Sequence, residues 1–495
     1  MLGSTLYAGG TDIAYYGDDF QFYFGTAPQH PLFYFFHKNP YALHTYRPVE
    51  AVFLSQMQYA FGMITFPIHL TQISLHILLC CLLLSGMRRQ GFSCTQSFLA
   101  ALYLLVSQAN PHAVLSNDTF SQVLGALTGF LSLYFFSLWV ADEPTVPPSR
   151  NKLFYLSSLG FFSLSLFAKE TSASFFLIIL GMLLVDKGLT VRQGSVFRSF
   201  VIQSAPFTVV LVVYLSIRFS LGLPGVQFGQ EDYQFRIGKN VLYNIALLTF
   251  QAFLPYSSVD TFVAVQTGVY PKLLLALVST GVIMTATAYG HWRMRTPRVS
   301  FALCVLILVS FFPVFLLNHV SELYVYNAMP AVAILFGVGI GRLVTSRSHV
   351  RGVAIVCSLG LLLAHAASVQ SKTRLMKANG NRAGLLLREI RPYLQTVPAD
   401  GYLLLVNPSA DCLQYSVFLL PGFRVLEKGL HYLYTVAGRD NFAIEVLDEA
   451  TLSWRSLRHA VVLTLDGNGD IIPWTQSVQA PHEGHRAERS PSFTR

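Results

Sequence analysis

Long apolar segments separated by short polar connections run through most of the chain. A helix that crosses a bilayer needs roughly 20 apolar residues, within a range of about 17–25. Ten segments approach or reach this length, at residues 67–86, 97–109, 119–140, 152–168, 171–186, 200–221, 271–290, 299–317, 328–345 and 352–370. The pattern predicts an all-α polytopic membrane protein with about ten transmembrane helices.

The stretches outside these segments have a different character. Residues 1–66 are polar and dense in Tyr and Phe, which favours an outer loop with interfacial helices. Residues 240–255 alternate apolar and polar groups and predict another interfacial helix. Beyond residue 371, the segments GYLLLVNP and HAVVLTLDGNGD predict short strands, with a helix over 380–395. We therefore divide the chain into a first outer loop at 1–66, a transmembrane core at 67–370, a small α/β module at 371–480 and a disordered end at 481–495.

Composition and charge agree with a lipid environment. Of the 495 residues, 53% are hydrophobic and 12% are charged, with a mean hydropathy of +0.48. Soluble domains carry about a quarter charged residues. The formal net charge is +9, but the basic residues gather in alternate connections, and residues 110–118 and 318–327 contain no Lys or Arg. Because basic loops stay in the cytoplasm, this excess reflects membrane orientation, and no nucleic-acid partner is expected.

The same alternation predicts which parts of the chain lie outside the cytoplasm. They are residues 1–66, 110–118, the turn near 169, 222–270, 318–327 and the tail after 371. A translocated tail of 66 residues needs a helix to carry it across, so we expect a hydrophobic segment upstream of Met1. The six cysteines form no CxxC pair, so we predict neither a disulfide framework nor a cysteine metal site.

The adjacent acids Asp18 and Asp19, in YYGDDF, are the first candidates for chemistry on the outer side. Neighbouring carboxylates repel one another, so one of them is expected to have a raised pKa and to act as a general base toward an acceptor hydroxyl. The pair also offers oxygen ligands if a divalent metal is required. The alternative is a pair of solvated loop acids or a helix cap.

Basic residues at the outer edge are candidates for binding a phosphate. Lys169 and Glu170 share a tight turn between two predicted helices, where Lys169 would bind phosphate and Glu170 would orient it. Arg47, in TYRP, suits two-point phosphate recognition. The alternatives are a surface ion pair or a snorkelling lysine at 169, and a membrane-surface anchor at Arg47.

Four further polar residues are supporting candidates, because polar groups at a membrane edge are costly. His112 and Asp118 lie in the connection 110–118, and Glu322 and Tyr324 lie in the connection 318–327. A helix-ending turn at Pro111 is the alternative for the first connection, and an interfacial belt is the alternative for the second.

In their order along the chain, these clusters resemble the GT-C superfamily of membrane glycosyltransferases, and especially the protein O-mannosyltransferases that carry tetratricopeptide repeats. The resemblance covers about residues 12–345. It rests on Asp18-Asp19, on Tyr46-Arg47-Pro48, on PIHLTQISLH at 67–76, on Asn110-Pro111-His112-Ala113-Val114, on Ala168-Lys169-Glu170, and on the segment from Ser321 to Asn327. The tetratricopeptide repeats are absent from this sequence, which leaves the acceptor open.

The resemblance implies an integral membrane glycosyltransferase that moves a sugar from a polyprenyl-phosphate donor to a glycan, lipid or protein acceptor. It implies a base in the first outer loop and basic residues at the lipid phosphate. The bacterial inner membrane, with the site on the periplasmic side, is the expected location. Two alternatives stay open: a transporter or flippase for lipid-linked sugars, which would need ionisable groups near the bilayer midplane, and a non-catalytic scaffold.

Overall fold

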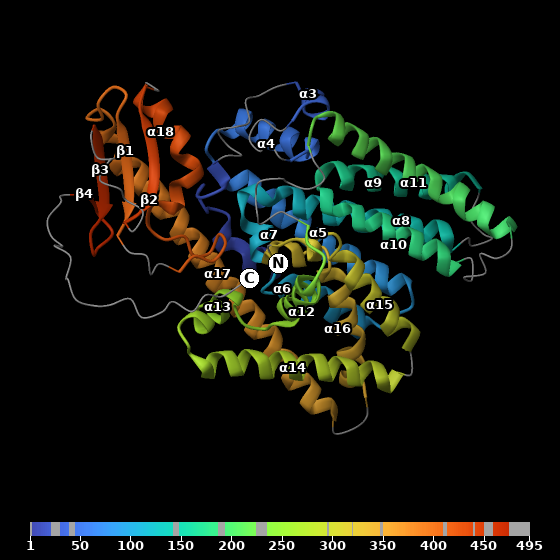
Figure 1. Cartoon of the computed structure of the whole chain (residues 1–495). Helices are drawn as coiled ribbons and strands as arrows, with labels where there is room; N and C mark the ends of the chain where they lie inside the picture. Colours follow the sequence, from blue (N-terminus) through green and yellow to red (C-terminus); the bar gives the residue numbers. More distant parts are fainter. Residues whose placement is uncertain are drawn as a thin grey trace.

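The computed structural model describes residues 2–20, 30–38, 45–141, 148–186, 194–223, 235–294, 297–318, 320–346, 350–408, 413–438, 441–449 and 459–474. The end at 481–495, predicted to be disordered, lies outside these residues. Each of the ten predicted apolar segments corresponds to a helix (Figure 1). These helices are α5 (Phe66–Arg89), α6 (Cys94–Val106), α8 (Phe120–Val140), α9 (Pro148–Ala168), α10 (Ala173–Asp186), α11 (Gly194–Ser220), α14 (Tyr270–Met294), α15 (Pro297–Ser310), α16 (Met329–Val344) and α17 (Val350–Leu394).

Five stretches among the described residues are long and apolar enough to cross a membrane by length and composition. They comprise α5, α8 with the turn before it, most of α11, α14 and α17. Four further stretches are apolar but shorter: α6, most of α15, α16, and Glu170–Val185, which contains most of α10. The chain is therefore an integral membrane protein built from apolar helices.

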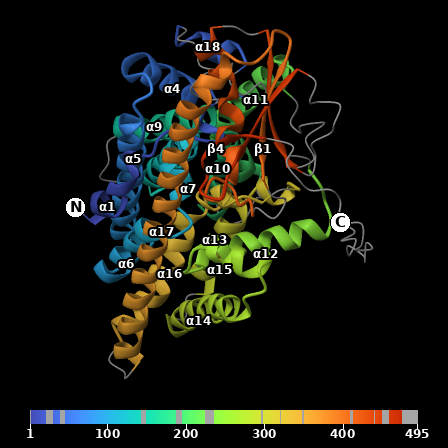
Figure 2. The same cartoon turned by 90° about the vertical axis from the view of Figure 1, so that its left-hand side faces the viewer.

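Two helices differ from the predicted segments. The helix predicted over 299–317 ends at Ser310 as α15, because Pro313 cannot continue it. The segment 352–370 and the helix predicted over 380–395 are one continuous helix, α17, of 45 residues. No proline interrupts the sequence before Pro392, so nothing forces a break near residue 371. The last apolar helix therefore runs directly into the soluble module (Figure 2).

The N-terminal residues pack into the helical core. They form α1 (Leu2–Tyr7), η1 (Ala8–Gly10), α3 (Phe33–Phe36) and α4 (Pro48–Phe61). The aromatic side chains of this region were predicted to lie at the membrane interface, but Tyr15, Tyr16, Phe20 and Tyr34 are buried. An added Cβ at Gly380 would lie 2.7 Å from the carbonyl oxygen of Ala14, so this segment crosses α17 at close range.

Short helices connect the long ones. They are α7 (Pro111–Leu115), η2 (Asn117–Thr119), η3 (Glu170–Ser172), α12 (Lys239–Phe253), α13 (Ser258–Gln266), η5 (Val314–Leu316) and η6 (Glu322–Val325). The interfacial helix predicted over 240–255 is α12. It packs against η5 and η6, and Asn244 donates hydrogen bonds from Nδ2 to the carbonyl oxygens of Phe315 and Leu317.

The C-terminal module is a four-stranded sheet in the order β2-β1-β3-β4. Its strands are β1 (Tyr402–Asn407), β2 (Ala443–Asp448), β3 (Ala460–Leu465) and β4 (Ile471–Pro473), with η7 (Gly422–Gly429) and α18 (Leu430–Ala437) beside them. The two predicted strands are β1 and β3, which pair in parallel with Tyr402 opposite Ala460. Figure 1 shows this sheet beside the C-terminal end of α17. We use "module side" for the end of the helical bundle that faces the sheet.

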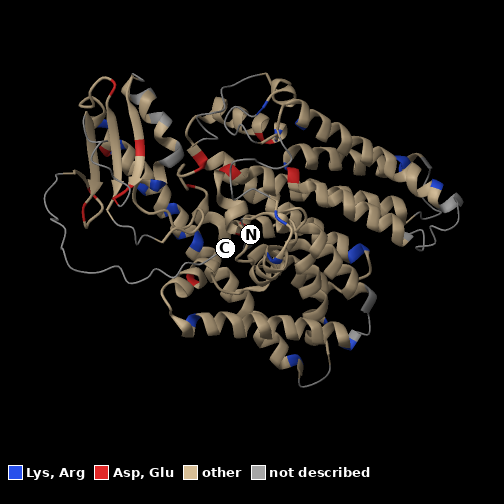
Figure 3. Ribbon diagram, viewed as in Figure 1, with Lys and Arg blue, Asp and Glu red and all other residues tan. Residues whose placement is uncertain are grey.

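Acidic residues are distributed unevenly between the two ends of the bundle. Figure 3 shows most of them on the module side, whereas Lys and Arg lie both along α17 on the module side and at the far ends of the helices. The residues at the far ends include Arg88, Arg89, Arg150, Arg293 and Arg342. This is the distribution expected if the module side faces away from the cytoplasm.

Candidate functional site

Asp19 is a buried carboxylate held by the connection between α7 and α8. Only 2% of the surface of Asp19 is exposed. Its Oδ2 accepts a hydrogen bond of 2.9 Å from Asn117 Nδ2, and its Oδ1 accepts bonds from Ser116 Oγ at 3.3 Å and from the Asp118 backbone nitrogen at 3.2 Å. Three donors from one tight turn thus fix the position of this carboxylate.

The acid that faces Asp19 is Asp118, and not its sequence neighbour Asp18. The Ser116 hydroxyl lies between the two acids and also contacts Asp118 Oδ1 at 2.6 Å. Burial, and then the charge of Asp118, hold the pKa of Asp19 well above its usual range. Asp118 is only partly buried, whereas Asp18 is exposed. The sequence suggested that the adjacent acids Asp18 and Asp19 act as a pair. The fold instead brings together Asp19 and Asp118, which are 99 residues apart in the chain.

Arg47 binds Glu170 through two parallel hydrogen bonds. Arg47 lies directly before α4, with Pro48 at the first helical position. Its Nε and Nη2 donate to Glu170 at 2.8 and 2.7 Å, and its Nη1 lies 3.5 Å from Glu50 Oε2. Burial alone would raise the pKa of Glu170, but the charges of Arg47 and Lys169 outweigh it and lower the pKa. Arg47 and Glu170, predicted as separate phosphate candidates, therefore form one pair.

Glu50 is a fully buried acid beside this pair that the sequence reasoning missed. It is 0% exposed, and its Oε1 accepts a hydrogen bond of 3.1 Å from the Ser121 backbone nitrogen. Burial raises the pKa of Glu50, although the nearby charges of Arg47 and Lys169 oppose the shift. Glu50 therefore holds its proton more readily than an exposed glutamate would.

Lys169 is a buried cation at the same place. It lies between α9 and η3 and is 4% exposed. Among the described residues, no carboxylate lies within ion-pair distance of its ammonium group. Burial, followed by repulsion from Arg47, lowers the pKa of Lys169 to about 8. The charges of Glu170, Glu50 and Asp118 oppose this shift from beyond ion-pair distance, so an anion bound in direct contact would add a close counter-charge and stabilise the ammonium group.

Arg218, at the end of α11, is a third cation of this group. Its charge contributes to the lowered pKa of Glu170, which places it near the Arg47–Glu170 pair. The sequence reasoning did not select Arg218, because it ends an apolar helix and resembles a membrane anchor. We name Arg47, Lys169 and Arg218 the cation cluster.

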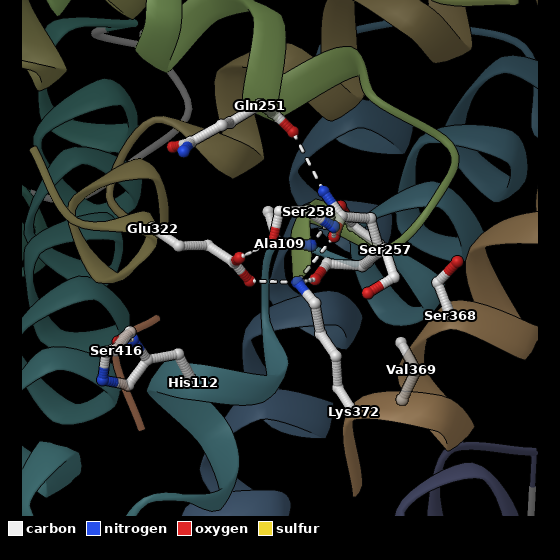
Figure 4. A network of polar contacts seen from close by, with 12 residues as sticks. Ala109, His112, Gln251, Ser257, Ser258, Glu322, Ser368, Val369, Lys372 and Ser416 are labelled. Atoms are coloured by element: carbon white, nitrogen blue, oxygen red, sulfur yellow. Dashed lines mark hydrogen bonds and ion pairs between the residues drawn. The ribbon is translucent and has the colours of Figure 1, made fainter. Parts of the chain in front are cut away.

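A second buried network connects Glu322 to α17 (Figure 4). Lys372 Nζ donates to Glu322 Oε1 at 2.6 Å, to Gln108 Oε1 at 2.6 Å and to the Gln108 carbonyl oxygen at 2.7 Å. Ser258 donates a hydrogen bond to Glu322 Oε2. Lys372 was not selected from the sequence, because it lies in a basic stretch that resembled the start of a soluble tail. Tyr324, a supporting candidate, is partly buried next to Glu322 in η6.

Residues of the C-terminal module cover His112 and Lys372. The Ser416 hydroxyl lies 3.3 Å from His112 Nδ1, and the Phe418 ring centroid lies 5.0 Å from Lys372 Nζ. Asn379 on α17 donates from Nδ2 to the carbonyl oxygens of Val417 and Phe418, which holds the segment in place. Burial lowers the pKa of His112, while the charges of Asp118 and Glu322 oppose the shift. His112 therefore lies between the acid pair and the Glu322 network.

The arrangement brings a carboxylate pair close to a cation cluster on the module side. The charge of Asp118 acts on Lys169 as well as on Asp19, so the two groups are neighbours. Among the described residues, no group of three or more His, Cys, Asp or Glu side chains is arranged to hold a metal ion. The site can thus bind an anion and accept a proton beside it.

Comparison with known proteins supports the fold. No protein-family model and no curated protein matches the chain. Two crystal structures of ArnT from Cupriavidus metallidurans do match: one bound to undecaprenyl phosphate, with a TM-score of 0.51, and one in the apo state, with a TM-score of 0.53. Each is 14% identical and covers 94% of this chain and 92% of the ArnT chain.

The chain therefore has an ArnT-like fold with a small C-terminal sheet module. The fold class expected from the sequence motifs is confirmed. At this identity the likeness establishes the fold alone, and the O-mannosyltransferase type stays a prediction.

Proposed function

We propose that this protein transfers a sugar from a polyprenyl-phosphate donor to an acceptor, at the periplasmic face of a bacterial inner membrane. The observation that carries the proposal is Lys169, a buried lysine close to Arg47 with no described carboxylate in ion-pair contact. The charge of Asp118 also acts on it, which places it near the Asp19–Asp118 pair. The fold likeness to ArnT bound to undecaprenyl phosphate supports a lipid-phosphate ligand of this kind.

The donor phosphate would bind at the cation cluster. A phosphodiester carries one negative charge, which Lys169 can neutralise. The two bonds to Glu170 fix the plane of the Arg47 guanidinium, so that its positive charge is held close to Lys169. As the bond between the sugar and the phosphate oxygen breaks, the phosphate leaves with an additional negative charge. Cations fixed at that oxygen stabilise the transition state more than the ground state.

The acid pair would accept the proton of the acceptor. The acceptor hydroxyl or amine forms a bond to the anomeric carbon, polyprenyl phosphate departs, and the acceptor proton moves to a carboxylate. Asp118 is the better placed of the two to meet the acceptor, because it is only partly buried, whereas Asp19 is held by three donors. Burial and the charge of Asp118 raise the pKa of Asp19, so this pair accepts a proton more readily than two solvated carboxylates would.

His112, Glu322 and Tyr324 would support the site without contacting the sugar phosphate. Glu322 holds Lys372, and His112 contacts the module segment at Ser416. The sequence resemblance to protein O-mannosyltransferases makes polyprenyl-phosphate mannose the first donor to examine. We leave the acceptor as a glycan, lipid or protein group that carries a hydroxyl or amine.

The test is turnover of purified protein with a panel of polyprenyl-phosphate sugars and a mixed acceptor extract. Release of polyprenyl phosphate from at least one donor, dependent on the extract, is the expected result. If no donor is consumed but a labelled donor crosses the membrane of proteoliposomes, the protein is a transporter, and the proposal is wrong.

A further inference from the structure

The end of the bundle opposite the module contains a basic pocket between three helices. It has a volume of about 300 Å³ and lies between the C-terminal ends of α14 and α16 and the start of α17. Arg293 and Arg342 provide its charge, Thr345 and Ser346 provide hydroxyl groups, and Tyr289 forms one wall. Arg293 lies over the Tyr289 ring at 5.9 Å. The described lining contains no acidic residue.

Two apolar hollows continue from this pocket along α14. The first hollow has a volume of about 280 Å³ and shares Leu343 with the basic pocket. Residues of α14, α16 and α17 line it. The other shares Tyr289 with the basic pocket and includes Gly281. Both hollows include Val282 and Ala286, so they lie side by side on α14, and we call the two together the groove. α14 and α17 both pack on α16, and the groove follows the space that they leave.

The groove has the length of one membrane leaflet. From Arg293 to Val278 there are 15 residues of α14, which span about 22 Å at 1.5 Å per residue. Half of a bilayer, including its headgroup region, is roughly 20–22 Å thick. Val278 and Val282 are 54% and 55% exposed, so the groove wall is open to the surrounding lipid. The basic pocket thus lies at headgroup depth, and the apolar groove lies at acyl-chain depth.

We propose that this groove binds an anionic phospholipid, with the headgroup phosphate at Arg293 and Arg342 and an acyl chain along α14. Charge complementarity supports this ligand, because the cytoplasmic side of the membrane carries anionic lipid and basic pockets between helices bind such headgroups. The C-terminal ends of α14 and α16 point at the pocket, and on their own they disfavour an anion. The two arginines must therefore supply the attraction.

The site is separate from the proposed donor site: the basic pocket is formed by α14, α16 and α17 at the far end of the bundle, whereas the cation cluster lies beside α4, η3 and α11 on the module side. Lipid binding in the groove does not depend on the proposed transfer reaction. The competing explanation is that Arg293 and Arg342 are general anchors for a cytoplasmic surface. General anchors would not distinguish one lipid headgroup from another, and they would not need a free groove beside them.

Native mass spectrometry of the full chain in detergent tests the proposal, with phosphatidylglycerol, phosphatidylcholine of the same chains, and glycerol phosphate as probes. The wild type should bind phosphatidylglycerol more tightly than phosphatidylcholine. The Arg293→Gln/Arg342→Gln variant should lose this preference and bind phosphatidylglycerol at least about tenfold more weakly, since each basic group near the surface contributes about 1 kcal/mol. The matched control is Arg88→Gln/Arg89→Gln at the end of α5, which should bind as the wild type does.

A second variant fills the groove without removing charge. An added Cβ at Gly281 meets no atom within 4 Å, so Gly281→Leu should fold normally and exclude the acyl chain. It should weaken phosphatidylglycerol binding although both arginines remain. Equal binding of the two lipids by the wild type, or equal losses in the arginine variant and its control, would overturn the proposal. Displacement of the lipid by glycerol phosphate at equal concentration would show a free-phosphate site and overturn it as well.

Discussion

Lys372 and Glu322 form an ion pair of 2.6 Å in which neither side chain is exposed. The pair joins α17 to η6, and Lys372 also holds Gln108 and lies over the Phe418 ring of the module. It therefore connects three parts of the chain through one buried charge.

Replacing Lys372 alone should destabilise the protein strongly. Lys372→Met leaves the Glu322 carboxylate buried without its partner, which typically costs about 3–5 kcal/mol. The double variant Lys372→Met/Glu322→Leu should regain a large part of this loss, because no unpaired charge remains. Thermal unfolding in detergent measures both. A single variant as stable as the wild type would show that the pair does not stabilise the fold.

Donor use should decline as the pH rises through about 8, the pKa of Lys169 in the free protein. Below that pH Lys169 is charged and attracts the phosphate; above it the lysine is neutral and the attraction is lost. The donor phosphodiester does not titrate in this range. The expected observation is a fall in kcat/KM for the donor, which reports groups of the free enzyme.

Lys169→Arg is the matched control for this pH dependence. An arginine stays charged, so the decline near pH 8 should disappear even if the rate is lower overall. Lys169→Gln should show a low kcat/KM at every pH. An unchanged decline in Lys169→Arg would assign the titration to another group.

Arg47→Gln should raise the donor KM more than it lowers kcat, if its contact with the phosphate is equal in the ground and transition states. Arg47→Lys keeps the charge but loses the two-point geometry that the pair with Glu170 shows. It should therefore lie between the wild type and Arg47→Gln. Lys152→Gln, at the opposite end of the bundle, should leave donor kinetics unchanged. Wild-type donor kinetics in Arg47→Gln would remove Arg47 from the phosphate site.

The module side should lie outside the cytoplasm. Cysteines introduced at His30 and at Gln395, both exposed, should react with an impermeant maleimide added outside intact cells, in a chain whose native cysteines are replaced. A cysteine at Arg89 should react only after permeabilisation. The reverse pattern would invert the orientation and move the proposed site to the cytoplasmic face.

The helical architecture could be predicted from the sequence because apolar length alone identifies a helix that lies in lipid. All ten predicted segments correspond to helices, and the strands β1 and β3 were found from their apolar residues and the turns that follow them. The continuity of α17 was missed, since a change from apolar to polar residues marks where lipid ends and not where a helix ends.

The partners within the site could not be predicted, because they come from distant parts of the chain. Asp19 faces Asp118, Arg47 binds Glu170, and Lys372 binds Glu322 across intervals that no local pattern encodes. Glu50 lies in the first turn of α4 and Arg218 in the last turn of α11. From the sequence alone, the first resembles an ordinary surface acid and the second a membrane anchor. The aromatic residues near Asp19 were assigned to the membrane interface by composition, although the fold buries Tyr16 and Phe20.

Release of polyprenyl phosphate by three variants, compared at a saturating concentration of the best donor, tests the central claim most directly. Removing a general base typically costs about 10²–10⁴-fold in rate. Asp118→Asn and Asp19→Asn should each reduce kcat strongly, the first by removing the carboxylate proposed to meet the acceptor and the second by weakening the three hydrogen bonds that hold the turn of Asp118 in place. Asp18→Asn, at the exposed neighbour of Asp19, should retain the wild-type kcat. Wild-type turnover in both Asp19→Asn and Asp118→Asn, with donor binding intact, would contradict the transfer mechanism proposed for this site.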